Sequence, residues 1–187
     1  MPERPGTYRV ADGSAIAFAA ARASWTRPAR EHLLIVARSY GALTTYKDLA
    51  EDVQVRSGIR TRMLPWHWIG RVLGDVARDC HRRGEPLLSA LCVHADGTVG
   101  DGYVIATKEN YGIEPTDPDL HAAEERLACY RHFGATLPSG GGRAILPPQI
   151  MRRRQAKTRS VNAERKRAQC PNCFVELPVS GVCGFCE

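Results

Sequence analysis

Four of the seven cysteines lie within the last 18 residues of the chain, at spacings typical of metal ligands. They form two C-x2-C pairs separated by nine residues, namely Cys170, Cys173, Cys183 and Cys186. Each pair can supply two thiolates from one tight turn, and two such turns complete the tetrahedral shell that Zn²⁺ prefers. The sequence therefore predicts a structural zinc site with no open coordination position. Iron in the same four-thiolate shell is the alternative.

The segment 170–187 that carries these cysteines is predicted to be a small zinc ribbon. It is too short to build an apolar core, so the metal would supply most of its folding free energy. The other three cysteines, Cys80, Cys92 and Cys129, lie within apolar patterns. Free cysteine is among the most buried residue types, so these three are predicted to be core residues.

A run of cations precedes the cysteines. Between Met151 and Gln169 the acid Glu164 stands against eight basic residues, which are Arg152, Arg153, Arg154, Lys157, Arg159, Arg165, Lys166 and Arg167. This excess accounts for the formal charge of +6, so the rest of the chain is close to neutral. If all eight met phosphates, the logarithm of duplex affinity would fall with the logarithm of salt concentration with a slope of about −7. A basic segment beside a zinc ribbon predicts a nucleic-acid partner, and a solvated charged linker is the alternative.

Length and composition place the chain among ordinary globular proteins. It has 187 residues, of which 43% are hydrophobic and 25% charged, enough for one domain and an appendage. No stretch approaches the roughly 20 apolar residues that cross a bilayer, so no membrane partner is expected. Residues 1–6 lack the apolar centre of a secretory signal, and a cytoplasmic protein is the simplest expectation.

Local signals divide the chain into four parts. The segment Pro138-Ser139-Gly140-Gly141-Gly142 has the composition of a linker and marks the end of the main domain. The predicted parts are an N-terminal arm (1–23), a main domain (24–137), a basic linker (138–169) and the zinc ribbon (170–187). In the main domain a first helix is expected from about Arg27 with Thr26 as its cap. A last helix, capped by Thr116, is expected from about Asp117 to His132.

The region 41–103 is predicted to contain two helices followed by a β-hairpin. The first helix begins at Thr45, with Asp48 three residues later as an acidic variant of the capping box. The second helix extends over about residues 65–83, where apolar residues recur at helical spacing. Gln54 to Arg62 is expected to be a loop between them.

Two apolar runs of strand length, 87–94 and 98–106, flank Asp96-Gly97 and are predicted to form the hairpin. The glycines Gly100 and Gly102 within the second run indicate a bulge or a close backbone approach. Two helices and a hairpin are the elements of a winged helix-turn-helix, so the expected fold class is α/β (α+β), a winged-helix domain followed by a zinc ribbon.

Three segments in this order resemble the DNA-binding domain of the DNA alkyltransferases and alkyltransferase-like proteins. They are GALTTYKDLA at 41–50, IGRVLG at 69–74 and DGTVGDGY at 96–103. The resemblance implies a winged helix that binds duplex DNA and flips a damaged guanine out of the base stack. In the family, the cysteine of a P-C-H-R motif then takes up the alkyl group.

The chain departs from that family at the nucleophile. Counting back from Asp96-Gly97 places Ser89 where the family has its cysteine, and Cys80-His81-Arg82 falls in the preceding helix instead. Serine at its ordinary pKa is a far poorer nucleophile than a thiolate, and the sequence shows no local base for it. The expected function is therefore non-enzymatic binding of nucleic acid, with duplex DNA as the expected form and no catalytic residue.

The resemblance and the helix pattern together supply four candidate DNA contacts in the main domain. Tyr46 matches the family tyrosine that lies near the backbone of the flipped nucleotide, and His67 stands at the position of the intercalating arginine. Trp66 could act as a wedge beside His67, although packing of Trp66 and Trp68 onto neighbouring elements is the alternative. Arg71 lies on the polar face of the same predicted helix.

Two other functions stay open at this point. One is a nucleic-acid-processing enzyme, such as a nuclease or a defence component, for which His94 and Asp101 are the candidate ligands of a divalent ion. The other is a protein–protein adaptor that docks through the zinc ribbon and uses the basic linker for solubility alone.

Overall fold

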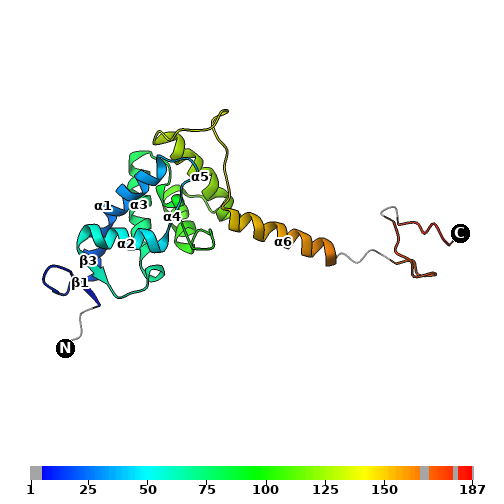
Figure 1. The fold of residues 1–187 in the computed structure, drawn as a ribbon, viewed down its shortest axis with the longest axis horizontal. Helices are drawn as coiled ribbons and strands as arrows, with labels where there is room; N and C mark the ends of the chain where they lie inside the picture. Colours follow the sequence, from blue (N-terminus) through cyan, green and yellow to red (C-terminus); the bar gives the residue numbers. More distant parts are fainter. Residues whose placement is uncertain (1–5, 165–168, 179–180, 187) are drawn as a thin grey trace. The chain divides into compact units, whose positions relative to one another are not determined.

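The computed structural model describes residues 6–164, 169–178 and 181–186. Its internal contacts divide the chain into two units, Met1–Pro148 and Gln149–Glu187. The described residues form a mixed α/β structure that is mostly helical, with six α-helices, two short 3₁₀ helices and four short strands (Figure 1). No helix in this described part combines the length and the apolar composition needed to cross a membrane.

Helix α1 (Phe18–Ala37) begins at Phe18, not near Arg27 as predicted, and contains Pro28 in its interior. The hydroxyl of Thr26 donates to the carbonyl of Arg22 over 2.9 Å, so Thr26 lies within the helix and does not cap it. The alanine-rich run at residues 15–21 has high helix propensity, and Ala21 and Trp25 of α1 are buried in the core. Part of the predicted N-terminal arm is therefore the start of α1.

Helix α2 (Tyr46–Ser57) begins as predicted. The backbone N–H of Asp48 donates to Oγ1 of Thr45 over 3.1 Å, and the Thr45 hydroxyl donates to Oδ2 of Asp48 over 2.7 Å. Gly58 ends the helix in the left-handed region at φ 66°. The prediction of a loop over residues 54–62 is wrong, because α2 continues to Ser57 and a strand follows it.

That strand, β3 (Ile59–Thr61), pairs antiparallel with β1 (Thr7–Arg9). After it come the 3₁₀ helix η1 (Pro65–His67) and helix α3 (Ile69–Arg83), which together cover the predicted second helix. Helix α3 ends at Gly84, whose φ of 64° forms a left-handed cap.

Residues 87–106 do not form the predicted hairpin, so the prediction of a wing, and with it of a winged helix, is also wrong. Residues 87–94 contain the 3₁₀ helix η2 (Leu88–Leu91) and the strand β4 (Cys92–Val93), while the predicted return strand lies largely in helix α4 (Asp101–Tyr111). Strand β4 pairs in parallel with β2 (Thr44–Thr45). The physical reason is burial: all four residues of η2 are buried, and α4 buries residues at helical spacing, not alternate residues.

Helix α5 (Pro118–His132) follows, with Asp117 as its N-cap in place of Thr116. The side chain of Asp117 accepts a hydrogen bond from the N–H of Leu120 over 3.1 Å. Part of the predicted basic linker 138–169 is helix α6 (Pro148–Glu164).

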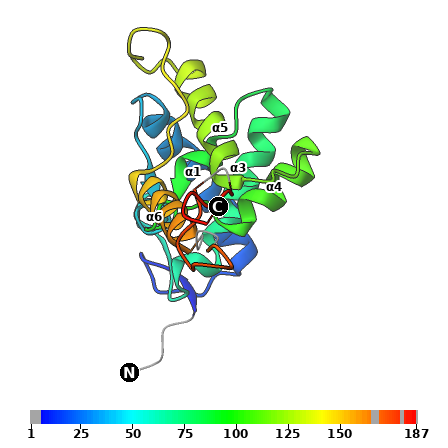
Figure 2. The same ribbon diagram turned by 90° about the vertical axis from the view of Figure 1, so that its right-hand side faces the viewer.

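The core of the first unit contains two tryptophans whose rings are in contact. Trp25 of α1 and Trp68, the residue before α3, are fully buried, with ring centroids 4.3 Å apart. Around them pack α1, α2, α3 and η2, and Figure 2 shows α1, α3 and α4 grouped in this unit. The predicted core cysteines Cys80, Cys92 and Cys129 are all buried, as expected.

Candidate nucleic-acid interface and metal centre

The four cysteines of the second unit come together as the sequence predicts. The Sγ atoms of Cys170 and Cys186 are 3.8 Å apart, those of Cys173 and Cys183 are 3.5 Å apart, and all four lie within 4.8 Å of one another. A tetrahedron of sulfurs at the usual Zn–S distance of about 2.3 Å has edges of about 3.8 Å. The arrangement can therefore hold one metal ion, and its identity is not fixed by these distances.

A tight turn positions the first pair of thiols. The N–H of Cys170 donates to the carbonyl of Val175 over 2.8 Å, and the N–H of Phe174 donates to the carbonyl of Cys170 over 2.9 Å. Phe174 adopts a left-handed conformation at φ 58°. Backbone N–H groups of Cys173 and Asn172 point at the Cys170 sulfur and lower its pKa to about 6, which favours the thiolate that a metal requires.

The pKa of the last cysteine, Cys186, shifts in the opposite direction to that of Cys170. Hydrogen bonding with Cys173 is the largest cause that raises the pKa of Cys186 to about 12. Crowded thiols cannot all ionise without a cation between them, whereas a bound metal ion stabilises all four thiolates together.

Helix α6 carries the described part of the basic segment. Its five described cations are Arg152, Arg153, Arg154, Lys157 and Arg159. All except the half-buried Arg154 are exposed, and residues 149–160 contain no Asp or Glu. Arg165, Lys166 and Arg167, the remaining predicted contacts, lie outside the described residues.

In the first unit, the predicted contacts line two hollows that share Trp66. One hollow, of about 1050 Å³, lies along α2 and the segment after β3, and Tyr46 and Trp66 are among its lining residues. The other, of about 360 Å³, lies between α3 and α4 and is lined by Trp66, His67 and Arg71. The structure thus brings the four candidates of this unit to one connected surface.

The two tryptophans flanking His67 have different environments. Trp68 is fully buried, so the packing alternative is correct for Trp68. Trp66, on η1, keeps 60% of its surface exposed. Arg71 lies with its guanidinium carbon 5.7 Å from the ring centroid of Phe18. Trp66 and Arg71 both line the smaller hollow, so this surface presents an exposed aromatic ring and a cation.

Tyr46 is held by contacts on two sides. Its ring lies 4.3 Å, centroid to centroid, from the ring of His94, and its hydroxyl accepts a hydrogen bond from the backbone of Gly100. Burial is the main cause that raises the pKa of Tyr46 to about 12. A Cβ on Gly100 would lie 2.5 Å from the Tyr46 hydroxyl, so the close backbone approach predicted at this glycine is confirmed.

Ser89 lines a small cavity of about 10 Å³ together with Tyr46, Gly70 and Gly102. These three lining residues come from the three sequence segments that resemble the alkyltransferase domain. Ser89 is buried, and its Oγ has no hydrogen-bond partner among the described residues. The cavity has room for about one water molecule.

His94 and Asp101 do not form a metal cluster with a third ligand. Within the described ranges, the cysteine group is the one set of three or more metal-ligating side chains whose atoms lie close together. His94 instead packs against Tyr46.

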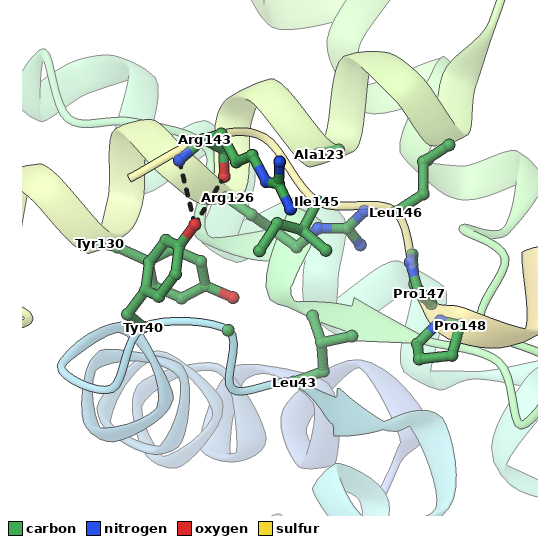
Figure 3. A pocket seen from close by; sticks show the side chains of 11 residues that line it. Tyr40, Leu43, Ala123, Arg126, Tyr130, Arg143, Ile145, Leu146, Pro147 and Pro148 are labelled. Atoms are coloured by element: carbon green, nitrogen blue, oxygen red, sulfur yellow. Dashed lines mark hydrogen bonds between the residues drawn. The ribbon is translucent and has the colours of Figure 1, made fainter. Parts of the chain in front are cut away.

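Arg126 of α5 is not among the functional residues predicted from the sequence. This arginine is buried and lines a pocket closed by residues 143–148 (Figure 3). Its position one turn before Tyr130, on the inward face of a predicted helix, was the available signal.

No protein-family model, no curated protein and no solved structure matches this chain.

Proposed function

We propose that this chain is a non-enzymatic protein that binds nucleic acid, with duplex DNA as its target. The observation that carries the proposal is the charge of α6: five cations lie on one helix, four of them are exposed, and residues 149–160 contain no carboxylate. Cations in such a run bind phosphates and release counterions, which supplies affinity without sequence specificity.

The surface around Trp66 supports a second contact. An exposed aromatic ring can stack on a base or enter between base pairs, and Arg71 and His67 line the hollow beside it. Tyr46 lines the neighbouring hollow, whose volume is about 1050 Å³. The resemblance of the segments around Tyr46, Gly70 and Gly102 to alkyltransferase-like proteins supports the same assignment, although residues 87–106 do not form the predicted hairpin.

The four cysteines are assigned a structural zinc ion in this proposal. A closed shell of four thiolates leaves no position for a substrate or a reactive water. Ser89 receives no chemical role, because it is buried and no described side chain is placed to take its proton.

The experiment is fluorescence anisotropy with labelled duplexes across a salt series. Replacing Arg152, Lys157 and Arg159 by glutamine removes three exposed cations of α6. If each contacts a phosphate, the slope of log affinity against log salt becomes less steep by about 3.

The matched control removes three exposed cations of the first unit, Arg82, Arg83 and Lys108, which already pair with carboxylates. It makes the same change in net charge, and the slope should stay as in the unmodified protein. An equal effect of the two variants would mean that net charge alone matters, and no binding at low salt would refute the proposal. Duplexes alkylated at guanine and matched RNA duplexes establish whether a lesion or RNA is preferred.

An adaptor is the second candidate, and exposed apolar side chains in the second unit favour it. Phe174 and Phe185 are 73% and 83% exposed, and Val182 is also exposed. Such residues are common where a protein partner docks. The adaptor function predicts that the three glutamine substitutions in α6 leave partner capture unchanged.

A further inference from the structure

Helix α6 is exposed around its whole circumference over residues 155–160. All six of these residues are exposed, and six consecutive residues make more than one and a half turns of an α-helix. Ile150, near the start of the helix, is buried, but the only exposed apolar residues in 151–160 are Met151 and Ala156. This part of α6 therefore has no apolar stripe along which another helix or a sheet could pack.

The cations of α6 lie on different sides of the helix axis. Arg152 and Arg159, which we call the first pair, are about 20° apart around the axis at roughly 100° per residue. Arg153 and Lys157, the second pair, are about 40° apart. The centres of the two pairs are separated by about 130°, and Arg154 lies about 60° beyond Lys157. Positive charge thus covers more than half of the circumference.

This angular spread limits how α6 can meet phosphates. A helix that lies on a single phosphate backbone presents one side to it, so one pair would contact phosphates and the other would face solvent. Both pairs are neutralised when phosphates flank the helix on two sides. The major groove of B-form DNA provides this arrangement, because it is about 12 Å wide and an α-helix with its side chains is about 10–12 Å across. A phosphate backbone borders each side of that groove.

The other grooves of duplex nucleic acids do not fit an α-helix in this way. The minor groove of B-form DNA is about 6 Å wide, which is narrower than the helix. The major groove of A-form RNA is deep and narrow. Along its axis, the cationic stretch 152–159 covers about 10 Å, which corresponds to about three base pairs of B-form DNA. The shape of α6 therefore favours DNA over RNA.

Repulsion between the cations gives phosphates a second effect on α6. Like charges four residues apart, such as Arg153 and Lys157, destabilise a helix. Residues 148–163 contain no Asp or Glu that would offset this repulsion. Phosphates on both sides of the helix would offset it, so binding in the groove also stabilises the helix.

We propose that α6 lies in the major groove of B-form duplex DNA, with the first pair toward one phosphate backbone and the second pair toward the other. This inference rests on the proposed nucleic-acid function and adds the groove and the orientation of the helix. Contacts to phosphates carry no sequence information, so this helix positions the protein on DNA of any sequence.

Two double variants with the same change in net charge test the orientation. They are Arg152→Gln with Arg159→Gln, and Arg153→Gln with Lys157→Gln. Two phosphate contacts contribute about 2 to the slope of log affinity against log salt, or a roughly 12-fold loss of affinity between 50 and 200 mM salt. In a groove, each variant should lose this contribution. Loss in one variant alone, or in neither, would overturn the orientation.

The groove is tested with duplexes whose cytosines carry glucosylated 5-hydroxymethyl groups, because substituents at pyrimidine C5 project into the major groove. The affinity of the unmodified protein should fall to that of a quadruple variant with all four glutamines. The quadruple variant should bind modified and plain duplexes equally. Unchanged affinity of the unmodified protein, or an equal fall in both proteins, would overturn the groove assignment.

Two controls separate this inference from other causes of failure. Glutamine has a helix propensity close to those of arginine and lysine, so far-ultraviolet circular dichroism of the variants should be unchanged. The modified duplex tests the groove with the unmodified protein even if a variant loses its helix. Absence of any binding to plain duplex at low salt would refute the proposed function itself, whereas binding that ignores the modification refutes the groove assignment alone.

Discussion

Replacing Gly100 by alanine tests the contact that holds Tyr46 in place. The backbone of Gly100, at φ −82° and ψ 167°, suits any residue, so alanine brings no conformational strain. The added Cβ would lie 2.5 Å from the Tyr46 hydroxyl oxygen and 2.9 Å from Nε2 of His94. Both distances are shorter than real Cβ contacts, so Tyr46 and His94 must move.

Overpacking of this kind costs about 1–3 kcal/mol, and the lower entropy of the unfolded alanine chain offsets about 0.4–1 kcal/mol of it. We therefore expect a net loss of about 1–2 kcal/mol. In a unit of this size, that loss lowers the unfolding midpoint by roughly 2–8 °C. Circular dichroism melts of the two proteins measure the difference.

The matched control is Gly74→Ala in α3. A Cβ at Gly74 meets no atom within 4 Å, and alanine is favoured over glycine inside a helix by about 1 kcal/mol. Gly74→Ala should therefore raise the midpoint while Gly100→Ala lowers it. If both substitutions raised it, the close packing of Gly100 against Tyr46 would be incorrect.

Three further outcomes follow from the burial and chemistry of single groups. Trp66 is the exposed member of the three tryptophans, so acrylamide should quench its fluorescence and duplex DNA should protect it from this quenching. Both effects should be lost in Trp66→Phe. If DNA still protected tryptophan fluorescence from acrylamide in that variant, Trp66 would be excluded from the interface. Metal chelation should release four thiols to a thiol reagent while the helical circular dichroism and melting of the first unit persist, and simultaneous loss of that melting would contradict two independent units. Burial raises the pKa of Tyr46 and Tyr130 from about 10 to about 12, so their contribution to stability is fully present below pH 10 and is lost as pH rises through 12. The buried thiols of Cys80, Cys92 and Cys129 also have raised pKa values, so urea unfolding midpoints should begin to fall above about pH 9, with a smaller fall in Tyr46→Phe.

The sequence alone predicted the structure correctly where a short segment determines that structure. The cap formed by Thr45 and Asp48 and the end of α3 at Gly84 depend on residues within a few positions of one another, and the four cysteines lie in one short segment, 170–186. These predictions are confirmed because the hydrogen bonds or sulfur contacts involved need little from the rest of the fold.

Predictions that depended on tertiary packing failed. The run 98–106 has the length and composition of a strand, but Tyr103, Ala106 and Thr107 of α4 bury one helical face. The run 87–94 is apolar because η2 is enclosed on every side, which a strand pattern cannot distinguish from a short helix. The start of α1 was missed because Thr26 has the chemistry of an N-cap, and Pro28 two residues later suits the first turn of a helix.

The same division applies to the candidate sites. Cysteine spacing identified the metal ligands, whereas the sequence could not tell which of Trp66 and Trp68 is exposed. Arg126 was missed because an arginine in a helix is ordinarily solvated. Its burial, with two donors that lack partners among the described residues, is a property of three-dimensional packing.

Strand β1, near the start of the chain, pairs with β3 and so positions the surface segment that follows β3 in the sequence. Thr7 pairs with Thr61, and the N–H of Arg62 donates to the carbonyl of Gly6 over 2.8 Å, four residues before Trp66. The segment that carries the exposed ring is thus anchored by the first strand. Proteolytic trimming that removes β1 would free this segment and disorganise the Trp66 surface while sparing the helical core, so cleavage near the amino end could switch off one contact and leave the basic helix α6 intact.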